Sequence, residues 1–74
     1  MIRKVFLTFP QRLIEDPILY DLVKLYPVKT NIRGASVTPE IALVALQLEG
    51  EEGDLTAAID HLVELGVQVE HVGD

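Results

Sequence analysis

The fold is decided by residues 41–72, IALVALQLEGEEGDLTAAIDHLVELGVQVEHV. This stretch opens with residues 41–48, which are apolar at nearly every position. Such a run is typical of a strand that is covered on one face and at least partly on the other. We therefore expect this strand in the middle of a sheet.

An acidic turn and an amphipathic helix follow this strand. Residues 49–54 carry four acids and two glycines, a composition that favours a solvated turn. Asp54 is the predicted N-cap, because its carboxylate can accept from the free N–H groups of the first helical turn. Gly66 is suited to end the helix in the left-handed conformation, and residues 67–72 alternate as a second strand. Between these ends, apolar residues recur at helical spacing, at Leu55, Ala58, Ile59, Leu62 and Leu65.

The N-terminal half has the same types of element. Residues 3–9 alternate as a strand, and residues 10–15 form a connection. A helix is predicted next, with Asp16 as its N-cap and Pro17 as its first residue. Pro27 ends this helix, because proline cannot continue it.

Residues 28–37 predict another strand, in which Gly34 marks a bulge or a close backbone approach. Residues 38–40 form a turn into the strand at 41–48.

The predicted order of strand, helix, strand, strand, helix, strand is the split βαβ pattern of an α+β ferredoxin-like fold. Right-handed crossovers then give a four-stranded antiparallel-type sheet of order 4-1-3-2, with both helices on one face. We expect residues 1–74 to form one such domain. The predicted core residues are Val5, Leu7, Ile18, Leu22, Val44, Leu46, Leu48, Ile59 and Leu62.

The other sheet face is left open in this arrangement. It would carry an apolar patch of Phe6, Ile41 and Leu43, which indicates a partner or ligand surface, although tolerated surface hydrophobicity is an alternative. The second and fourth strands are the predicted edges. We expect self-association through one of these edges or through the patch.

Composition excludes several classes of protein. The chain is 49% hydrophobic, which argues against disorder, and it lacks cysteine, which removes disulfides and thiolate metal sites. Neither an apolar run of about 18 residues nor a secretory leader is recognised. We therefore expect a cytoplasmic protein that does not insert into a membrane.

The charge distribution argues against nucleic-acid binding. All six Lys and Arg lie in residues 3–33 and nine of the twelve acids in residues 40–74, so the two parts carry +3 and −9. A surface that binds the phosphate backbone of a nucleic acid needs clustered cations and a positive overall charge. RNA stacking would need aromatic residues on both central strands, and only Phe6 is suitable.

No catalytic or metal-binding constellation is evident. The single serine, Ser36, is far in sequence from His61, predicted on the solvent side of a helix, and from His71, near the end of an edge strand. The acids at 49–54 lack the spacing of a calcium-binding loop. The loop after the first strand has no cysteine for a thiolate metal site and no glycine for an anion-binding cradle. We therefore expect no enzymatic activity, no metal and no cofactor.

Several short segments together resemble the NIL domain, over about residues 16–72. They are the helix opening Asp16-Pro17-Ile18-Leu19, the strand 28–32 with Asn31-Ile32, the turn Leu48-Glu49-Gly50 and the ending from Ala58-Ile59 to Glu70. This family occurs at the C-terminus of the ATPase subunit of bacterial methionine-import ABC transporters and beside iron–sulfur ferredoxin domains. The resemblance implies a sensor whose paired domains bind methionine and inhibit transport.

On this resemblance, the motif Asn and Ile fall on Asn31 and Ile32, and Arg33 stands where the family has an apolar residue. The chain is thus expected to be a regulatory domain that binds methionine or a similar amino acid at a homodimer interface. Its candidate ligand-binding residues are Asn31, Ile32, Arg33, Phe6 and Leu43. The alternative is a protein–protein interaction module that holds a partner subunit on the open face or an edge strand and binds no small molecule.

Overall fold

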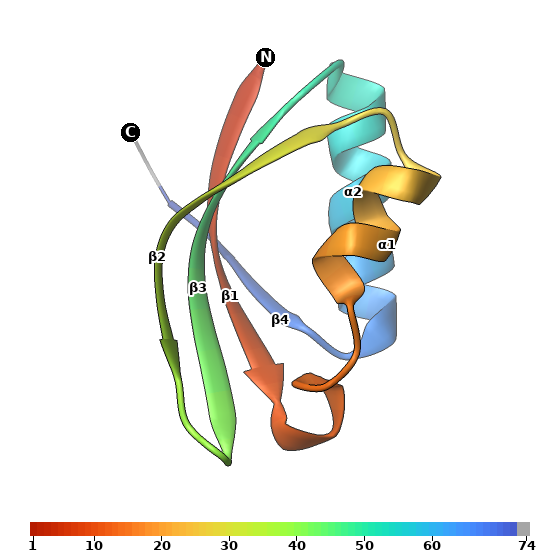
Figure 1. Ribbon diagram of the computed structural model, residues 1–74. Helices are drawn as coiled ribbons and strands as arrows, with labels where there is room; N and C mark the ends of the chain where they lie inside the picture. The colour runs from red at the N-terminus through yellow and green to blue at the C-terminus, as the bar shows by residue number, and fades with distance from the viewer. Residues whose placement is uncertain (73–74) are drawn as a thin grey trace.

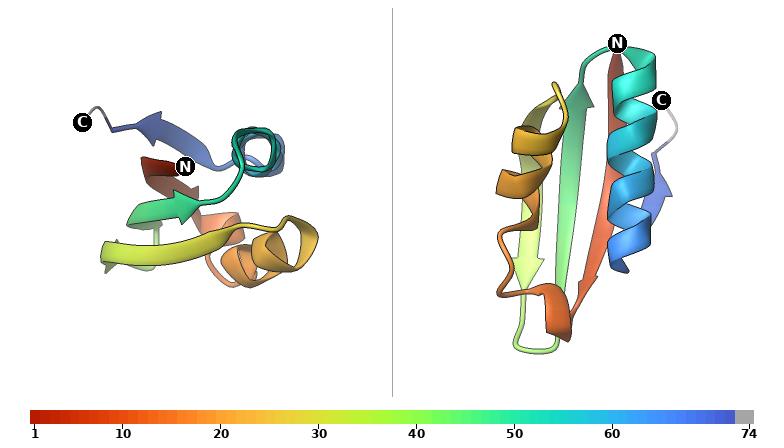
Figure 2. Two further views of the ribbon diagram at one scale, coloured as in Figure 1. Left: turned by 90° about the horizontal axis from the view of Figure 1, so that it is seen from above. Right: turned by 90° about the vertical axis from the view of Figure 1, so that its right-hand side faces the viewer.

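A computed structural model describes residues 1–72 and shows a sheet covered by helices on one face (Figure 1). Views from above and from the helical side show two layers, with α1 lying over β2 and α2 over β1 (Figure 2). The elements in chain order are β1 (Ile2–Pro10), the 3-10 helix η1 (Gln11–Leu13), α1 (Ile18–Leu25), β2 (Lys29–Val37), β3 (Ile41–Glu49), α2 (Glu52–Leu65) and β4 (Gln68–His71).

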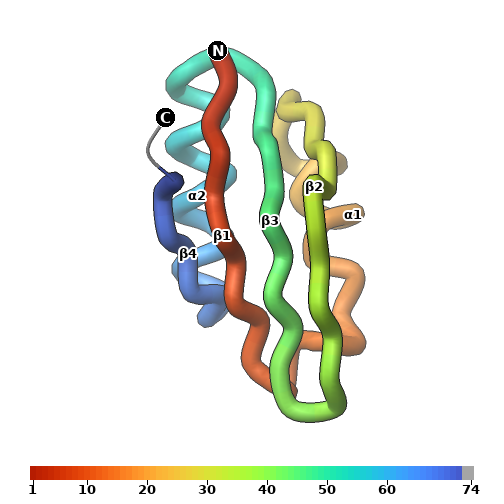
Figure 3. The backbone as a smooth tube through the Cα atoms, turned by 90° about the vertical axis from the view of Figure 1, so that its left-hand side faces the viewer, coloured from red at the N-terminus to blue at the C-terminus, as the bar shows by residue number. Residues whose placement is uncertain are grey.

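The sheet has the order β2-β3-β1-β4, and each neighbouring pair is antiparallel. This confirms the predicted order and the α+β ferredoxin-like arrangement. The central pair is in register along both strands, from Ile2 opposite Glu49 to Pro10 opposite Ile41. Figure 3 shows the face of the sheet that no helix covers.

The core lies between the sheet and the helices. All nine residues predicted for it are buried, and Leu46 is 1% exposed. The alternation along β3 explains this, because residues 42, 44, 46 and 48 are buried while their neighbours face the open side. Further buried residues are Phe9, Leu13, Val28, Ala42, Leu55, Ala58 and Val67.

Both predicted N-caps are wrong. α2 begins at Glu52, with Glu51 as N-cap, so the acidic turn is shorter than expected and Asp54 lies inside the first helical turn. Acidic side chains there still face the positive end of the helix dipole, which makes the early start favourable. At α1 the N-cap is Pro17 rather than Asp16, because a tight turn from Ile18 N to Asp16 O (2.8 Å) holds Pro17 outside the helical region.

Gly66 ends α2 as predicted, with a left-handed φ of 104°. The guanidinium of Arg12 lies against this glycine and donates from Nη2 to the carbonyl oxygen of Leu65 at 3.2 Å. Arg12 thereby satisfies one of the free carbonyls at the helix end. It also joins the loop after β1 to the end of α2.

Candidate functional site

The open face carries the apolar patch that the alternation predicts. Phe6, Ile41 and Leu43 are 49%, 39% and 46% exposed, although their neighbours along the strands are buried. Phe6 lies opposite Ala45, and Leu43 lies opposite Thr8, one row along the sheet. Large apolar side chains in adjacent rows of an uncovered face form one contiguous surface.

A β-bulge changes the edge of this face at Arg33. The pairing of β2 with β3 shifts between Ile32, opposite Leu46, and Gly34, opposite Ala45, which leaves Arg33 as the extra residue. Its Nη1 donates to Oε1 of Gln47 at 3.3 Å on the open face. Gly34 had indicated such a bulge, and the structure confirms it.

The bulge and the patch enclose a shallow hollow of about 200 Å³, here called the Ala45 hollow. Its walls include the Phe6 ring and the Arg33 side chain, and Ala45 lies between them. The hollow exists because the side chain of Ala45 is small, whereas those of Phe6 and Arg33 beside it are long. Its lining residues are Lys4, Val5, Phe6, Arg33, Ala45, Leu46 and Val72.

Two of the five sequence-predicted ligand residues, Phe6 and Arg33, thus meet at this hollow. Asn31 lies one row away, opposite Gln47 and on the same face, and Leu43 lies one row away in the other direction. Ile32 pairs with Leu46 and so belongs to the helical side of β2, where its edge position leaves it 55% exposed. The sequence did not indicate that Lys4 and Val72 would also line the Ala45 hollow.

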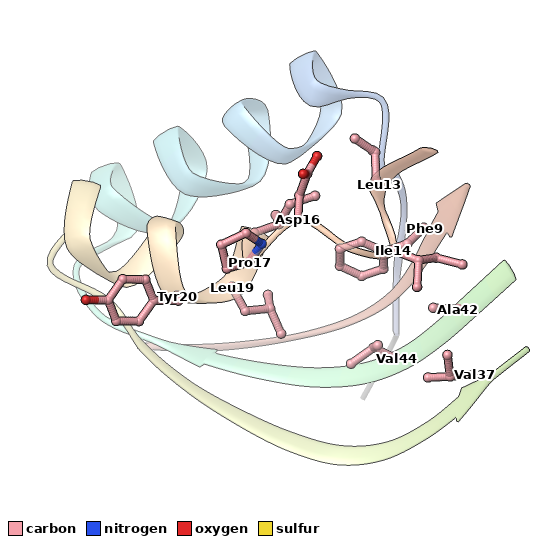
Figure 4. Close-up of a pocket in the computed structure, with 11 residues that line it drawn as sticks. Phe9, Leu13, Ile14, Asp16, Pro17, Leu19, Tyr20, Val37, Ala42 and Val44 are labelled. Carbon is pink, nitrogen blue, oxygen red and sulfur yellow. The ribbon is translucent and has the colours of Figure 1, made fainter. Parts of the chain in front are cut away.

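A second pocket, of about 280 Å³, lies on the helical side (Figure 4). It arises because the eight residues of α1 span about 12 Å, whereas the nine residues of β2 or β3 span about 30 Å. Part of the β2–β3 hairpin is therefore uncovered near Val37. Figure 4 shows aliphatic side chains and the rings of Phe9 and Tyr20 around it, with the Asp16 carboxylate pointing away from the strands. Such a lining is mainly apolar and can hold an apolar group.

The residues considered for catalysis lie apart. Ser36 pairs with Leu43 and faces the open side, whereas His61 lies in the helical layer on the opposite side of the sheet. His61 was predicted on the solvent side of α2, and this was wrong: it is half-buried and its ring lies 5.5 Å from that of Tyr26. His71 lies on β4, opposite Val5. These three side chains cannot form a triad.

Two further properties bear on function. Within residues 1–72, His, Asp and Glu side chains form no group of three that could hold a metal ion. In the same part of the chain, neither helix is long and apolar enough to cross a membrane.

Comparison with known proteins reveals the family. A family model described as the NIL domain matches residues 3–71. The chain belongs to the NIL domain family. Among solved structures, this NIL domain is similar to the C-terminal domain of an ABC transporter ATP-binding protein from Enterococcus faecalis, with 29% identity and a TM-score of 0.84. The match covers 97% of this chain and 84% of that chain. No curated protein matches it in sequence.

Proposed function

We propose that this NIL domain is a non-enzymatic regulatory domain that binds methionine or a similar amino acid on its open sheet face, where copies of the domain are expected to meet. Its family and its likeness to the C-terminal domain of a transporter ATP-binding protein support a regulatory role beside such an ATPase. A cytoplasmic location follows from this proposal, because a transporter ATPase uses cytoplasmic ATP.

The observation that carries the proposal is the meeting of Phe6 and Arg33 at the Ala45 hollow. Two cations, Arg33 and Lys4, and no acid line this hollow, so it favours a carboxylate. The ring of Phe6 and the methyl of Ala45 offer an apolar surface beside the cations, which suits the side chain of an amino acid such as methionine.

Asn31 supplies the remaining polar contact in this proposal. It lies one row from the hollow on the same face, and its amide offers both a donor and an acceptor. Its oxygen can accept from the ligand's ammonium group while the guanidinium of Arg33 holds the carboxylate. Leu43 extends the apolar surface on the other side, and Ile32 supports the edge from the helical face.

Arg33 could act in either of two ways, which have opposite effects on the affinity for the amino acid. As a clamp, its guanidinium binds the carboxylate in two-pronged fashion. As a plug, its side chain fills the space that a thioether would need. The bond to Gln47 holds the guanidinium on the open face and at the hollow, which favours the clamp.

Titration calorimetry of the twenty amino acids tests this function. We expect heat with methionine or a similar amino acid, and binding that weakens about tenfold or more in Arg33→Leu. Lys29→Leu is the matched control, because it removes the same charge from β2 outside the hollow and should leave the affinity unchanged. Methionine binding that appears only in Arg33→Leu would identify Arg33 as a plug. No heat with any amino acid in either protein would overturn the sensor proposal.

The second candidate is an interaction module without a small ligand. It is favoured by the exposure of Phe6, Ile41 and Leu43, a patch that continues beyond the hollow toward the β2–β3 turn. A transporter ATPase or another subunit would then cover this patch. Calorimetry without heat, together with capture of such a subunit that Phe6→Ala abolishes, would favour the module.

A further inference from the structure

We infer that the groove between α1 and α2 is a docking site for a basic amphipathic helix of a partner protein. The apolar side chains of that helix lie between α1 and α2, and its arginines face the acids beside the groove. The groove lies on the helical side of the sheet, whereas the Ala45 hollow lies on the open face. This inference therefore goes beyond the proposed function and does not depend on a ligand at the hollow.

The groove, here called the interhelical groove, is a hollow of about 360 Å³ between two antiparallel helices (Figure 2). Its floor consists of core residues, of which Leu13 and Ile18 are each 6% exposed. Leu25 of α1 and Leu65 of α2 also line it, but they are 60% and 36% exposed. Exposed apolar side chains on both sides of a groove with an apolar floor are typical of a partner surface.

The spacing of residues along each helix explains how the groove is built. Ile18, Asp21 and Leu25 are three and four residues apart, so they lie on one side of α1. His61 and Leu65 are four residues apart and lie on the side of α2 that faces α1. Each helix thus buries one side against the sheet and presents a mixed strip of apolar and polar residues to the groove.

Two acids beside the groove determine the charge of its partner. Asp16 and Asp21 line the interhelical groove, and both are exposed. Within residues 1–72 neither carboxylate forms an ion pair, since the single pair in that range joins Arg3 to Glu52 at 3.6 Å. Both carboxylates can therefore accept hydrogen bonds from the cations of a partner.

The cation that lines the groove does not neutralise these acids. Nζ of Lys24 lies over the ring of Tyr20, 5.3 Å from the ring centre. Tyr20 does not line the groove and is 60% exposed, so this cation–π contact directs the ammonium group toward the outer surface of α1. The interhelical groove therefore favours a positively charged partner.

The C-terminal end of α2 strengthens this preference. The end of a helix carries partial negative charge and favours a cation, but the last turn of α2 contains Glu64 and no basic residue. Arg12 reaches this end from the loop after β1 and donates to the carbonyl oxygen of Leu65 at 3.2 Å. Since Leu65 lines the groove, an arginine of the partner would meet the same negative end.

A helix suits this groove because two helices that lie side by side offer their side-chain ridges to a third. The eight residues of α1 span about 12 Å, so about two turns of the partner make contact. The partner then needs apolar anchors at i, i+4 and i+7, with cations on either side of them. Arginine suits the acids better than lysine, because its planar guanidinium binds a carboxylate through two hydrogen bonds.

Fluorescence anisotropy with a designed peptide tests the inference. The probe is a fluorescein-labelled helical peptide with leucine at i, i+4 and i+7 and with arginine and alanine at its other positions. The control peptide has glutamate in place of each arginine. We expect the arginine peptide to bind in the micromolar range and the glutamate peptide to bind at least about tenfold more weakly.

Leu25→Ser and Val63→Ser are a matched pair for the apolar contact. Both side chains are exposed on a helix, at 60% and 55%, but only Leu25 lines the groove. Leu25→Ser should raise the dissociation constant of the arginine peptide about fivefold or more, and Val63→Ser by less than about twofold. Circular dichroism checks that both variants keep the fold.

Asp21→Lys and Asp60→Lys are a matched pair for the charge. Asp60 is exposed on α2 and does not line the groove. At physiological salt we expect about tenfold weaker binding in Asp21→Lys and less than about threefold in Asp60→Lys, because distant exposed charges are screened.

Three results would overturn the inference. The first is an arginine peptide that does not bind. The second is an equal loss in Asp21→Lys and Asp60→Lys, which would indicate attraction to the net charge alone. The third is a Leu25→Ser protein that binds the peptide as well as the Val63→Ser protein does.

Discussion

Arg33 and Gln47 are joined across β2 and β3, with Nη1 of Arg33 donating to Oε1 of Gln47 at 3.3 Å. Arg33 is the bulged residue of its strand, so this bond fixes the direction of a side chain that strand alternation alone does not determine. The acceptor, Gln47, is also the residue that pairs with Asn31 across the two strands. The polar end of the proposed site is therefore organised by one arginine and two amides.

Asn31→Ala is expected to weaken amino-acid binding by about 1–3 kcal/mol, because the ligand's polar group loses its partner. Ser36→Ala is the control, since Ser36 lies on the same face of β2 but opposite Leu43, away from the Ala45 hollow. Calorimetry of both variants with the amino acid that binds best measures the difference. Equal affinities for the two variants would remove Asn31 from the site.

Leu46→Ala is expected to destabilise the fold by about 2–5 kcal/mol through lost burial and a residual cavity. Leu43→Ala, on the opposite face of the same strand, should cost under about 1 kcal/mol, because Leu43 is 46% exposed. Denaturant melts give both values. A change below half a kcal/mol for Leu46→Ala would contradict the register of β3.

Gly66→Ala and Gly53→Ala should have opposite effects on the free energy of unfolding. At Gly66 an alanine would have to keep the left-handed φ of 104°, and its Cβ would displace the flexible guanidinium of Arg12, so we expect a loss of about 1–3 kcal/mol from the backbone strain. At Gly53, the second residue of α2, a Cβ meets nothing within 4 Å, so we expect a gain of about 0.4–1 kcal/mol from the reduced freedom of the unfolded chain. Thermal or chemical melts that ranked the two variants the other way would contradict this account of the helix end.

Much of the fold could be predicted because its signals are periodic. The apolar run at 41–48 identified the central strand, and its alternation placed Leu46 in the core and Leu43 on the open face, as the structure confirms. The helix ends were less predictable. Asp54 and Asp16 both have the chemistry of an N-cap, but α2 begins two residues before Asp54, and a turn at Asp16 makes Pro17 the N-cap of α1.

The candidate site was predicted in outline only. Alternation put Phe6 on the open face, but the proximity of Phe6 to Arg33 depends on strand pairing and on the bulge, which no local pattern specifies. The pocket beside Val37 could not be predicted either, because it results from the mismatch in length between α1 and the strands.

The central claim is that the open sheet face is the ligand surface, and amide chemical-shift mapping by NMR during a titration with L-methionine tests it most directly. The account predicts that the largest shift changes fall on Phe6, Ala45 and Arg33, around the Ala45 hollow. Changes confined to Leu19, Val37 and Ala42 would instead place the ligand in the pocket on the helical side. That result, or spectra that do not change at all, would contradict the claim.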